Sequence, residues 1–164
     1  MPESLRIAIA DDDRSTRELL QRMIAHLGHS VVATAENGET LIAQCKQVQP
    51  DVVITDNMMA DVNGMDAALE IYKSRPLPIV LLSGYCDPKL VRSAEEKHVL
   101  VYLVKPISEA HLEAALARCT EELRAAPMRE LDEQNDVLMS ATEQSGDSRF
   151  QTRSHTAPAE QRPV

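Results

Sequence analysis

The sequence lacks any run approaching the roughly eighteen consecutive apolar residues that mark a membrane-spanning helix. We therefore expect no membrane span, although 43% of the 164 residues are hydrophobic. The N-terminus has no basic lead, and charge soon interrupts its first apolar run, which is not the pattern of a secretory signal peptide. These features predict a cytoplasmic protein with one hydrophobic core and some chain left over.

Cysteine and histidine are scarce, and positive charge is in deficit. The three cysteines, Cys45, Cys86 and Cys119, lie singly in apolar contexts, which favours reduced core residues over disulfides or a metal site. The five histidines lack the spacing of metal ligands. A formal net charge of −9 argues against broad binding to nucleic acid phosphates, so we expect no direct nucleic acid partner.

What the sequence does contain is organised around residues 51–65. An apolar, β-branched run, Val52 to Ile54, is typical of a strand buried on both faces of a parallel sheet. Asp56 follows at the predicted strand end, and Asn63 with Gly64 closes the loop after it. A carboxylate in this position lies where open α/β sheets bind their ligands.

Short apolar runs alternate with helical patterns along the chain. We expect strands at residues 5–10, 30–34, 52–54, 79–82 and 99–104, each followed by a helix. The first helix is expected to bury Leu19 and Leu20 on one face and to stop at Gly28. Five β/α units in a row predict a doubly wound α/β domain of about 120 residues, with a five-stranded parallel sheet and helices on both faces.

Residues 124–164 differ in character from the rest. They are rich in Glu, Gln, Ser, Thr and Pro and show no second periodic core pattern, so we expect a largely disordered tail. The apolar residues Met128, Leu131, Val137 and Leu138 would, on a weaker pattern, extend a helix beyond Pro127.

Polar side chains follow four of the predicted strands. Because parallel strands finish at one edge of a sheet, Asp11, Asp12, Asp56, Ser83 and Lys105 should meet there. Three carboxylates in close proximity require a cation, and oxygen ligands without histidine or thiolate suit Mg²⁺. A lysine and a hydroxyl are groups that hold phosphoryl oxygens.

Four motifs resemble the receiver domain of two-component response regulators. They are the segments at residues 10–13 (ADDD), 55–64 (TDNMMADVNG), 81–84 (LLSG) and 102–106 (YLVKP). The resemblance covers residues 4–123, which would form a single receiver domain with the flavodoxin-like (βα)5 fold, as in the chemotaxis regulators.

The resemblance also implies a role for each site residue. Asp56 would be the phosphoacceptor and Lys105 the phosphate-contacting lysine, while Ser83 and Tyr102 would be the switch hydroxyl and the switch aromatic. The implied Mg²⁺ ligands are Asp11, Asp12, Asp56 and the backbone carbonyl of Met58. Met58 and Tyr85 occupy the positions that tune the lifetime of the phosphorylated state in this family.

By the same resemblance, the protein would take a phosphoryl group from a sensor histidine kinase or a phosphotransfer protein. It would catalyse only its own phosphorylation and dephosphorylation. A downstream protein partner would then bind the face formed by the fourth helix, the fifth strand and the fifth helix, with a dimer that depends on phosphorylation as a further possibility. The family pattern further implies a cis Lys105–Pro106 bond. It usually has proline where this chain has Ala60, which leaves the rigidity of that loop open.

Three other interpretations remain. Asp11 and Asp13 resemble the first motif of haloacid-dehalogenase-type phosphatases, but only Glu109 and Glu113 follow Lys105 as candidates for the later acidic pair. A binding module that takes no phosphate is a second alternative. RNA-binding antiterminator regulators have a similar receiver, but the three-helix output of those proteins does not occur in the tail.

Overall fold

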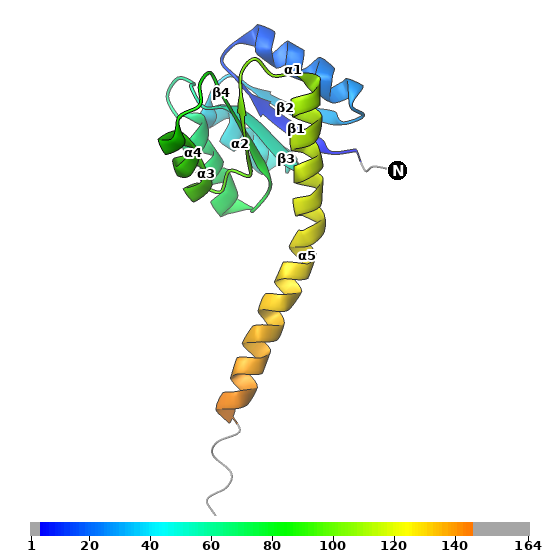
Figure 1. Ribbon diagram of the computed structural model, residues 1–164, viewed down its shortest axis with the longest axis vertical. Coiled ribbons are helices and arrows are strands. Elements are labelled where there is room, and N and C mark those ends of the chain that lie inside the picture. The colour runs from blue at the N-terminus through cyan, green and yellow to red at the C-terminus, as the bar shows by residue number, and fades with distance from the viewer. Residues whose placement is uncertain (1–3, 146–164) are drawn as a thin grey trace, which may run out of the picture. The chain divides into compact units, whose positions relative to one another are not determined.

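The computed structural model describes the backbone of residues 4–145 and the side chains of residues 4–127. Five strands form one parallel sheet in the order β2-β1-β3-β4-β5 (Figure 1). The strands are β1 (Arg6–Ala10), β2 (Ser30–Ala35), β3 (Val52–Asp56), β4 (Ile79–Ser83) and β5 (Val101–Val104). Strand order reverses between β1 and β3, which makes the carboxyl ends of these two strands the switch point of the sheet.

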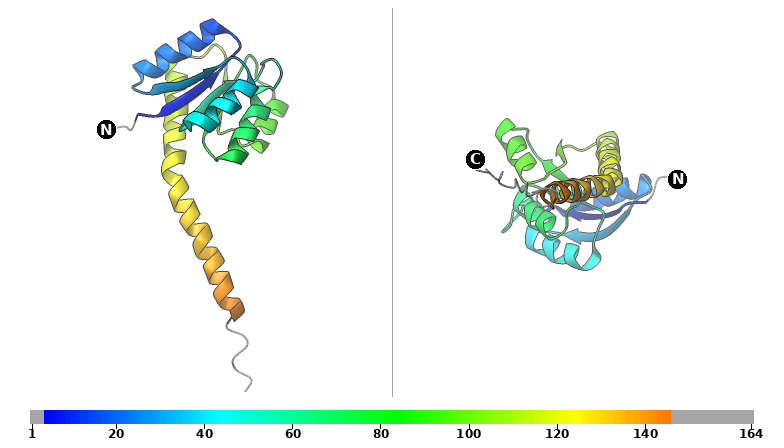
Figure 2. Two further views of the ribbon diagram at one scale, coloured as in Figure 1. Left: turned by 180° about the vertical axis from the view of Figure 1, so that it is seen from behind. Right: turned by 90° about the horizontal axis from the view of Figure 1, so that it is seen from below.

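Helices cover both faces of this sheet, as predicted. They are α1 (Arg14–His26), α2 (Gly38–Val48), α3 (Gly64–Ser74), α4 (Pro88–Glu96) and α5 (Glu109–Ser145). Helices α2, α3 and α4 pack on one face, while α1 and the first turns of α5 pack on the other (Figure 2). The flavodoxin-like doubly wound fold is confirmed.

The alternation of side chains along each strand supplies both layers of the core. In β1, Ala8 and Ala10 face α2 and α3, whereas Ile7 and Ile9 face α1 and α5, and all four are fully buried. Strands β3 and β4 divide in the same way. This arrangement explains why these strands are continuous apolar runs rather than alternating ones.

Asp and Asn side chains begin four of the helices at the carboxyl edge of the sheet. Each accepts a hydrogen bond from a backbone N–H in the first turn, which satisfies a donor that has no partner within the helix. These N-caps are Asp13 for α1, Asn37 for α2, Asn63 for α3 and Asp87 for α4. The caps fix the loops between strand and helix from which the site is built.

Two predicted core residues are exposed. Leu19 is 50% exposed because Leu20, Met23 and Ile24 form the stripe of α1 that faces the sheet. Cys86 is exposed because it lies in the loop after β4 rather than within an element. Cys45 and Cys119 are buried and free, as predicted.

Residues 124–145 are helical where a largely disordered tail was expected, and α5 agrees instead with the weaker pattern that extends a helix beyond Pro127. The segment has no glycine and is rich in Ala, Glu, Gln, Leu and Met, which have high helical propensity, and α5 accommodates Pro127 within it. The compact unit that carries the sheet ends at Ala125. Residues 146–164, with Phe150, lie outside the described residues. None of the helices described is both long and apolar enough to cross a membrane.

Candidate functional site

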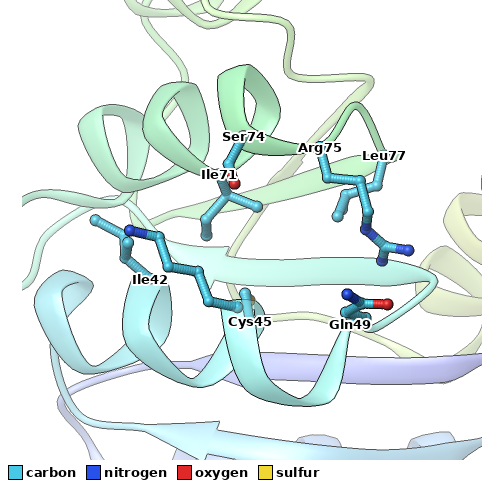
Figure 3. Close-up of a pocket in the computed structure, with 8 residues that line it drawn as sticks. Ile42, Cys45, Gln49, Ile71, Ser74, Arg75 and Leu77 are labelled. Carbon is cyan, nitrogen blue, oxygen red and sulfur yellow. The ribbon is translucent and has the colours of Figure 1, made fainter.

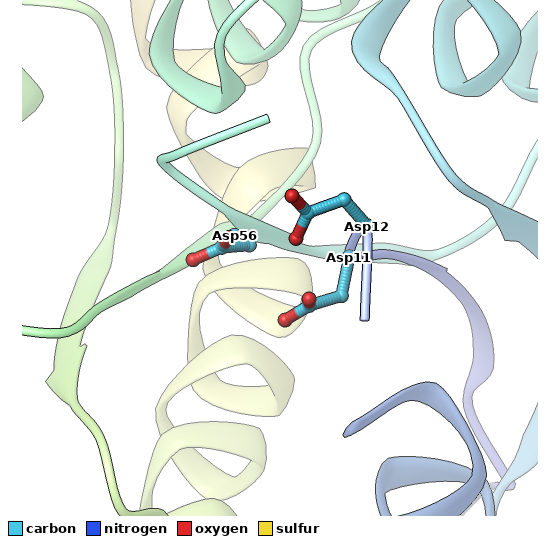
Figure 4. A group of neighbouring side chains, drawn as sticks. All are labelled: Asp11, Asp12 and Asp56. Carbon is cyan, nitrogen blue, oxygen red and sulfur yellow. The ribbon is translucent and has the colours of Figure 1, made fainter. Parts of the chain in front are cut away.

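Three carboxylates meet at the switch point of the sheet. Asp11 and Asp12 follow β1, Asp56 ends the neighbouring strand β3, and one oxygen of each lies within 4.8 Å of the others (Figure 4). Asp11 and Asp56 are buried, whereas Asp12 is exposed. The cluster is therefore closed on the side of the core and open to solvent through Asp12.

Lys105, directly after β5, bridges the two buried carboxylates. Its Nζ lies 2.8 Å from Asp11 Oδ2 and 3.2 Å from Asp56 Oδ1. Burial acts to lower the pKa of Lys105, but the hydrogen bonds and charges of the two aspartates outweigh it, so this pKa lies above its usual value. Lys105 is therefore a permanent cation at the site. The Lys105–Pro106 bond is cis, as expected.

The pKa of Asp56 is raised, whereas the pKa of a carboxyl in a stable ion pair is lowered. Burial raises it, the Asp11 carboxylate raises it further, and Lys105 only partly offsets these effects. One lysine thus does not balance three carboxylates. The donor set of carboxylate oxygens with an open side fits a hard cation that keeps several waters, which matches the predicted Mg²⁺.

Ser83 and Tyr102 share one hydrogen-bond acceptor beside this cluster. Ser83 is fully buried at the end of β4, and its hydroxyl donates to the Tyr85 carbonyl oxygen at 3.0 Å. The hydroxyl of Tyr102, a partly buried residue of β5, donates to the same oxygen at 2.8 Å. The structure thus brings the predicted switch residues together through the loop after β4.

Two close backbone approaches hold the loop between β3 and α3. An added Cβ at Gly64 would overlap the Asp56 carbonyl oxygen, and one at Gly38 would overlap the Val62 carbonyl oxygen. The Gly64 N–H also donates to the Asn57 carbonyl at 3.0 Å. These contacts constrain both ends of the loop, although Ala60 stands where the family usually has proline.

Arg17 in the first turns of α1 contacts the acidic loop and was not predicted as a site residue. Its Nη1 donates to the Asp11 carbonyl at 2.7 Å and, more weakly, to the Asp12 carbonyl at 3.4 Å, while Nη2 pairs with Glu36 Oε1 at 3.2 Å. A basic residue one helical turn after the N-cap Asp13 is the only sequence signal that points to it.

A pocket of about 200 Å³ lies between α2 and α3 (Figure 3), and none of the three cluster aspartates is among its lining residues. Its walls include Ile42, Ile71, Arg75 and Leu77, with Cys45 among them. Burial raises the pKa of the Cys45 thiol to about 11, so this thiol stays protonated at neutral pH. The pocket therefore offers no activated thiol nucleophile.

A doubly wound sheet with three carboxylates, a lysine and a buried hydroxyl at its carboxyl edge defines a flavodoxin-like α/β protein with an acidic switch-point site. The family model described as the response regulator receiver domain matches residues 7–117. The chain belongs to this family, and it carries a receiver domain of two-component response regulators.

Curated relatives carry names of the same kind. An uncharacterized response regulatory protein of Vibrio cholerae is 34% identical over 148 residues, which are 88% of this chain and 55% of that protein. The transcriptional regulatory protein PdtaR of Mycobacterium tuberculosis is 34% identical over 73% of this chain and 58% of its own length. The chain thus spans little more than half the length of these two relatives.

Solved structures share the fold. The receiver domain of the response regulator NarL from Mycobacterium tuberculosis superposes with a TM-score of 0.69 and 25% identity, over 73% of this chain and 98% of that one. The chemotaxis protein CheY4 of Vibrio cholerae gives a TM-score of 0.67 with 22% identity, over 71% and 99% of the two chains.

Proposed function

We propose that this protein is a phosphoacceptor response regulator whose Asp56 takes a phosphoryl group from a sensor histidine kinase or a phosphotransfer protein. Response regulators interact with histidine kinases and with downstream targets, and receiver domains bind Mg²⁺ at an acidic cluster. The observation that supports the proposal is that the Asp56 carboxylate lies beside both Lys105 and the acidic pair.

In the proposed transfer, one Asp56 oxygen attacks phosphorus while the phosphorus–nitrogen bond of the donor phosphohistidine breaks. The leaving imidazole keeps the electron pair of that bond and takes up a proton. Lys105 Nζ, 3.2 Å from Asp56 Oδ1, is placed to neutralise charge on the phosphoryl oxygens. Bound Mg²⁺, held by Asp11, Asp12, Asp56 and the Met58 carbonyl, would supply further charge neutralisation.

The hydrogen bonds of Ser83 provide the proposed switch. To donate to a phosphoryl oxygen, the Ser83 hydroxyl must leave the Tyr85 carbonyl, which Tyr102 also occupies. Loss of one donor changes the loop after β4, and Tyr102 turns inward with it. The face formed by α4, β5 and α5 would thereby change, and a downstream protein or a second receiver would bind there.

Labelling with acetyl phosphate tests the acceptor. With Mg²⁺ present, peptide mapping is expected to find the modification on Asp56, and chelation of Mg²⁺ should prevent it. Asp11→Asn, which retains the acceptor, should still be labelled at Asp56 but only at higher Mg²⁺ concentrations. Labelling of Asp11 in the native protein would favour the phosphatase interpretation instead, and no labelling at any carboxylate would favour a module that takes no phosphate.

The lifetime of the acyl phosphate is proposed to depend on Met58 and Tyr85. Hydrolysis needs a water aligned with the phosphorus, opposite the Asp56 oxygen. Met58 and Tyr85 are large, 63% and 53% exposed respectively, and lie in the loops after β3 and β4. Neither side chain carries a carboxylate or an amide that would orient a water, so we propose that they exclude water, and that the phosphorylated state is long-lived.

A double substitution measures this shielding. Replacing Met58 by Asn and Tyr85 by Glu together should speed loss of phosphate by about tenfold, equivalent to a barrier lowered by about 1.4 kcal/mol. Release of phosphate from labelled protein is followed with Mg²⁺ in excess. Leu19→Asn, at an apolar position on α1 that is 50% exposed, serves as the control and should leave the rate unchanged. An unchanged or slower rate in the double variant contradicts shielding.

A further inference from the structure

We infer that Arg17 is a positioning residue for the cation site: it fixes the turn that carries Asp11 and Asp12 without binding the cation itself. The inference rests on the proposed role of these aspartates as Mg²⁺ ligands. Arg17 belongs to α1, and its described hydrogen bonds go to neither the proposed phosphoacceptor nor the switch residues.

Arg17 binds the turn through its backbone rather than through its carboxylates. Among the described contacts, Nη1 donates to the carbonyl oxygens of Asp11, at 2.7 Å, and Asp12, at 3.4 Å. Arg17 thus does not compete with a cation for the two carboxylates on the same turn, although the Asp11 carboxylate also contacts Lys105. A guanidinium has five donors in a fixed fork, which allows it to hold two carbonyls on one side and a carboxylate on the other.

The second terminal nitrogen of the Arg17 guanidinium pairs with a residue that follows β2. Nη2 pairs with Glu36 Oε1 at 3.2 Å, just after β2, and only 13% of the Arg17 side chain is exposed. The Asp11 N–H donates in turn to the Ala35 carbonyl at 3.1 Å. Arg17 therefore ties three elements together at one point: the end of β1, the start of α1 and the end of β2.

Asp11 is held by Lys105, and Asp13 caps α1, but the Asp12 side of this turn has few described contacts of its own. Asp12 is exposed. Within the turn, the described hydrogen bond to a cluster carboxylate runs from the Asp13 N–H to Asp11 Oδ1, at 2.9 Å. Three carboxylates repel one another while the cation is absent. Without the two carbonyl contacts, that repulsion is expected to move the turn and to separate Asp12 from Asp56.

An effect of Arg17 through its charge and an effect through its position predict opposite changes in Mg²⁺ affinity when this residue is replaced. Arg17 is a cation close to a cation site, so through charge alone its removal would strengthen Mg²⁺ binding. If Arg17 instead fixes the turn, its removal weakens Mg²⁺ binding although a repulsive charge has been lost. The direction of the change in Mg²⁺ affinity therefore separates the two effects.

Calorimetric titration of the unphosphorylated full chain with Mg²⁺ provides the test. Arg17→Gln and Arg17→Lys are both expected to weaken binding by about tenfold, because neither side chain can replace the fork. Glu36→Gln, which leaves Arg17 in place but loosens its anchor, should weaken binding by a smaller factor. The rate of phosphorylation by acetyl phosphate should recover to within a few-fold of the native rate when Mg²⁺ is raised to saturation.

Arg14→Gln is the matched control. Arg14 lies on the same helix, its side chain is 83% exposed, and it pairs only with Glu18, at 2.9 Å, among the described contacts. Its removal changes the net charge by the same amount as Arg17→Gln and should leave Mg²⁺ affinity within about twofold of the native value.

The outcomes are distinct. Unchanged or tighter Mg²⁺ binding in Arg17→Gln overturns the inference, even if the variant melts at a lower temperature, because Arg17 would then be only structural. If Arg17→Lys binds Mg²⁺ with the affinity of the native protein, a guanidinium is not required at this position. If the native protein itself binds no Mg²⁺, the proposed function fails first, which is a different result from a native protein that binds and variants that bind equally well.

Discussion

Asp56→Asn is expected to abolish phosphorylation and, in the absence of Mg²⁺, to melt at a higher temperature than the native protein. Asparagine has almost the shape of aspartate but offers no carboxylate to phosphorus. It also removes a buried negative charge whose pKa is raised by burial and by Asp11. The gain should be several degrees, since about 1 kcal/mol moves the melting temperature of a domain of this size by roughly 4 °C.

The pH dependence of this difference follows from the direction of the shift. A carboxyl whose pKa is raised on folding stabilises the fold below its unfolded value of 3.8, and that contribution is lost as the pH rises through the folded pKa. The advantage of Asp56→Asn should therefore be small in acid, grow across this window, and stay constant above it. Thermal melts in EDTA across pH measure it.

Mg²⁺ should reverse the order of the two melting temperatures. A ligand at one hundred times its Kd stabilises the folded state by about 2.7 kcal/mol, and the native protein has one more carboxylate with which to bind the cation. If Asp56→Asn melts no higher than the native protein in EDTA, the lost contact with Lys105 outweighs the relief of repulsion. That result would contradict the description of the site as under-neutralised.

Gly64→Ala is expected to cause the second large loss. Its Cβ would overlap the Asp56 carbonyl oxygen and lie 2.8 Å from the carbonyl carbon, and both are backbone atoms that cannot rotate away. We expect a destabilisation of about 3 kcal/mol from overpacking. Phosphorylation should slow by about 100-fold, because displacement of the Asp56 backbone by about 1 Å misaligns the attacking oxygen.

Urea unfolding and acetyl phosphate kinetics measure the two effects of this substitution. Gly84→Ala is the control for stability, since an added Cβ there meets no atom within 4 Å and the glycine has no left-handed φ. It should unfold within about 0.5 kcal/mol of the native protein. Equal stability of Gly64→Ala and Gly84→Ala would show that the loop after β3 can shift to accept a methyl group.

The sequence was sufficient to predict the sheet and the convergence of its polar strand ends. Apolar runs such as Val52 to Ile54 are local signals, and parallel connectivity then determines which edge of the sheet carries Asp11, Asp56 and Lys105. The register that places these residues side by side follows from the same connectivity. For this reason the carboxylate cluster could be predicted without knowledge of any distance.

Features that depend on contacts between elements could not be predicted in this way. The reach of Arg17 to two carbonyls and to Glu36, and the shared use of the Tyr85 carbonyl, require the relative positions of three elements. The exposure of Leu19 depends on which stripe of α1 meets the sheet. In residues 124–145 the local signal is helical propensity, and the segment is helical although it has no periodic core pattern.

The unequal burial of the three carboxylates also determines how a cation reaches its site. Asp12 lies at the surface, whereas Asp11 and Asp56 lie beneath it. An ion arriving from solvent meets Asp12 first and then the deeper pair, so loading requires no unfolding of the domain. If the cluster binds Mg²⁺ as proposed, its occupancy would follow the free Mg²⁺ concentration around the protein. On the proposed function, the readiness of this receiver to accept a phosphoryl group would thereby depend on the ionic composition of its surroundings before any donor arrives.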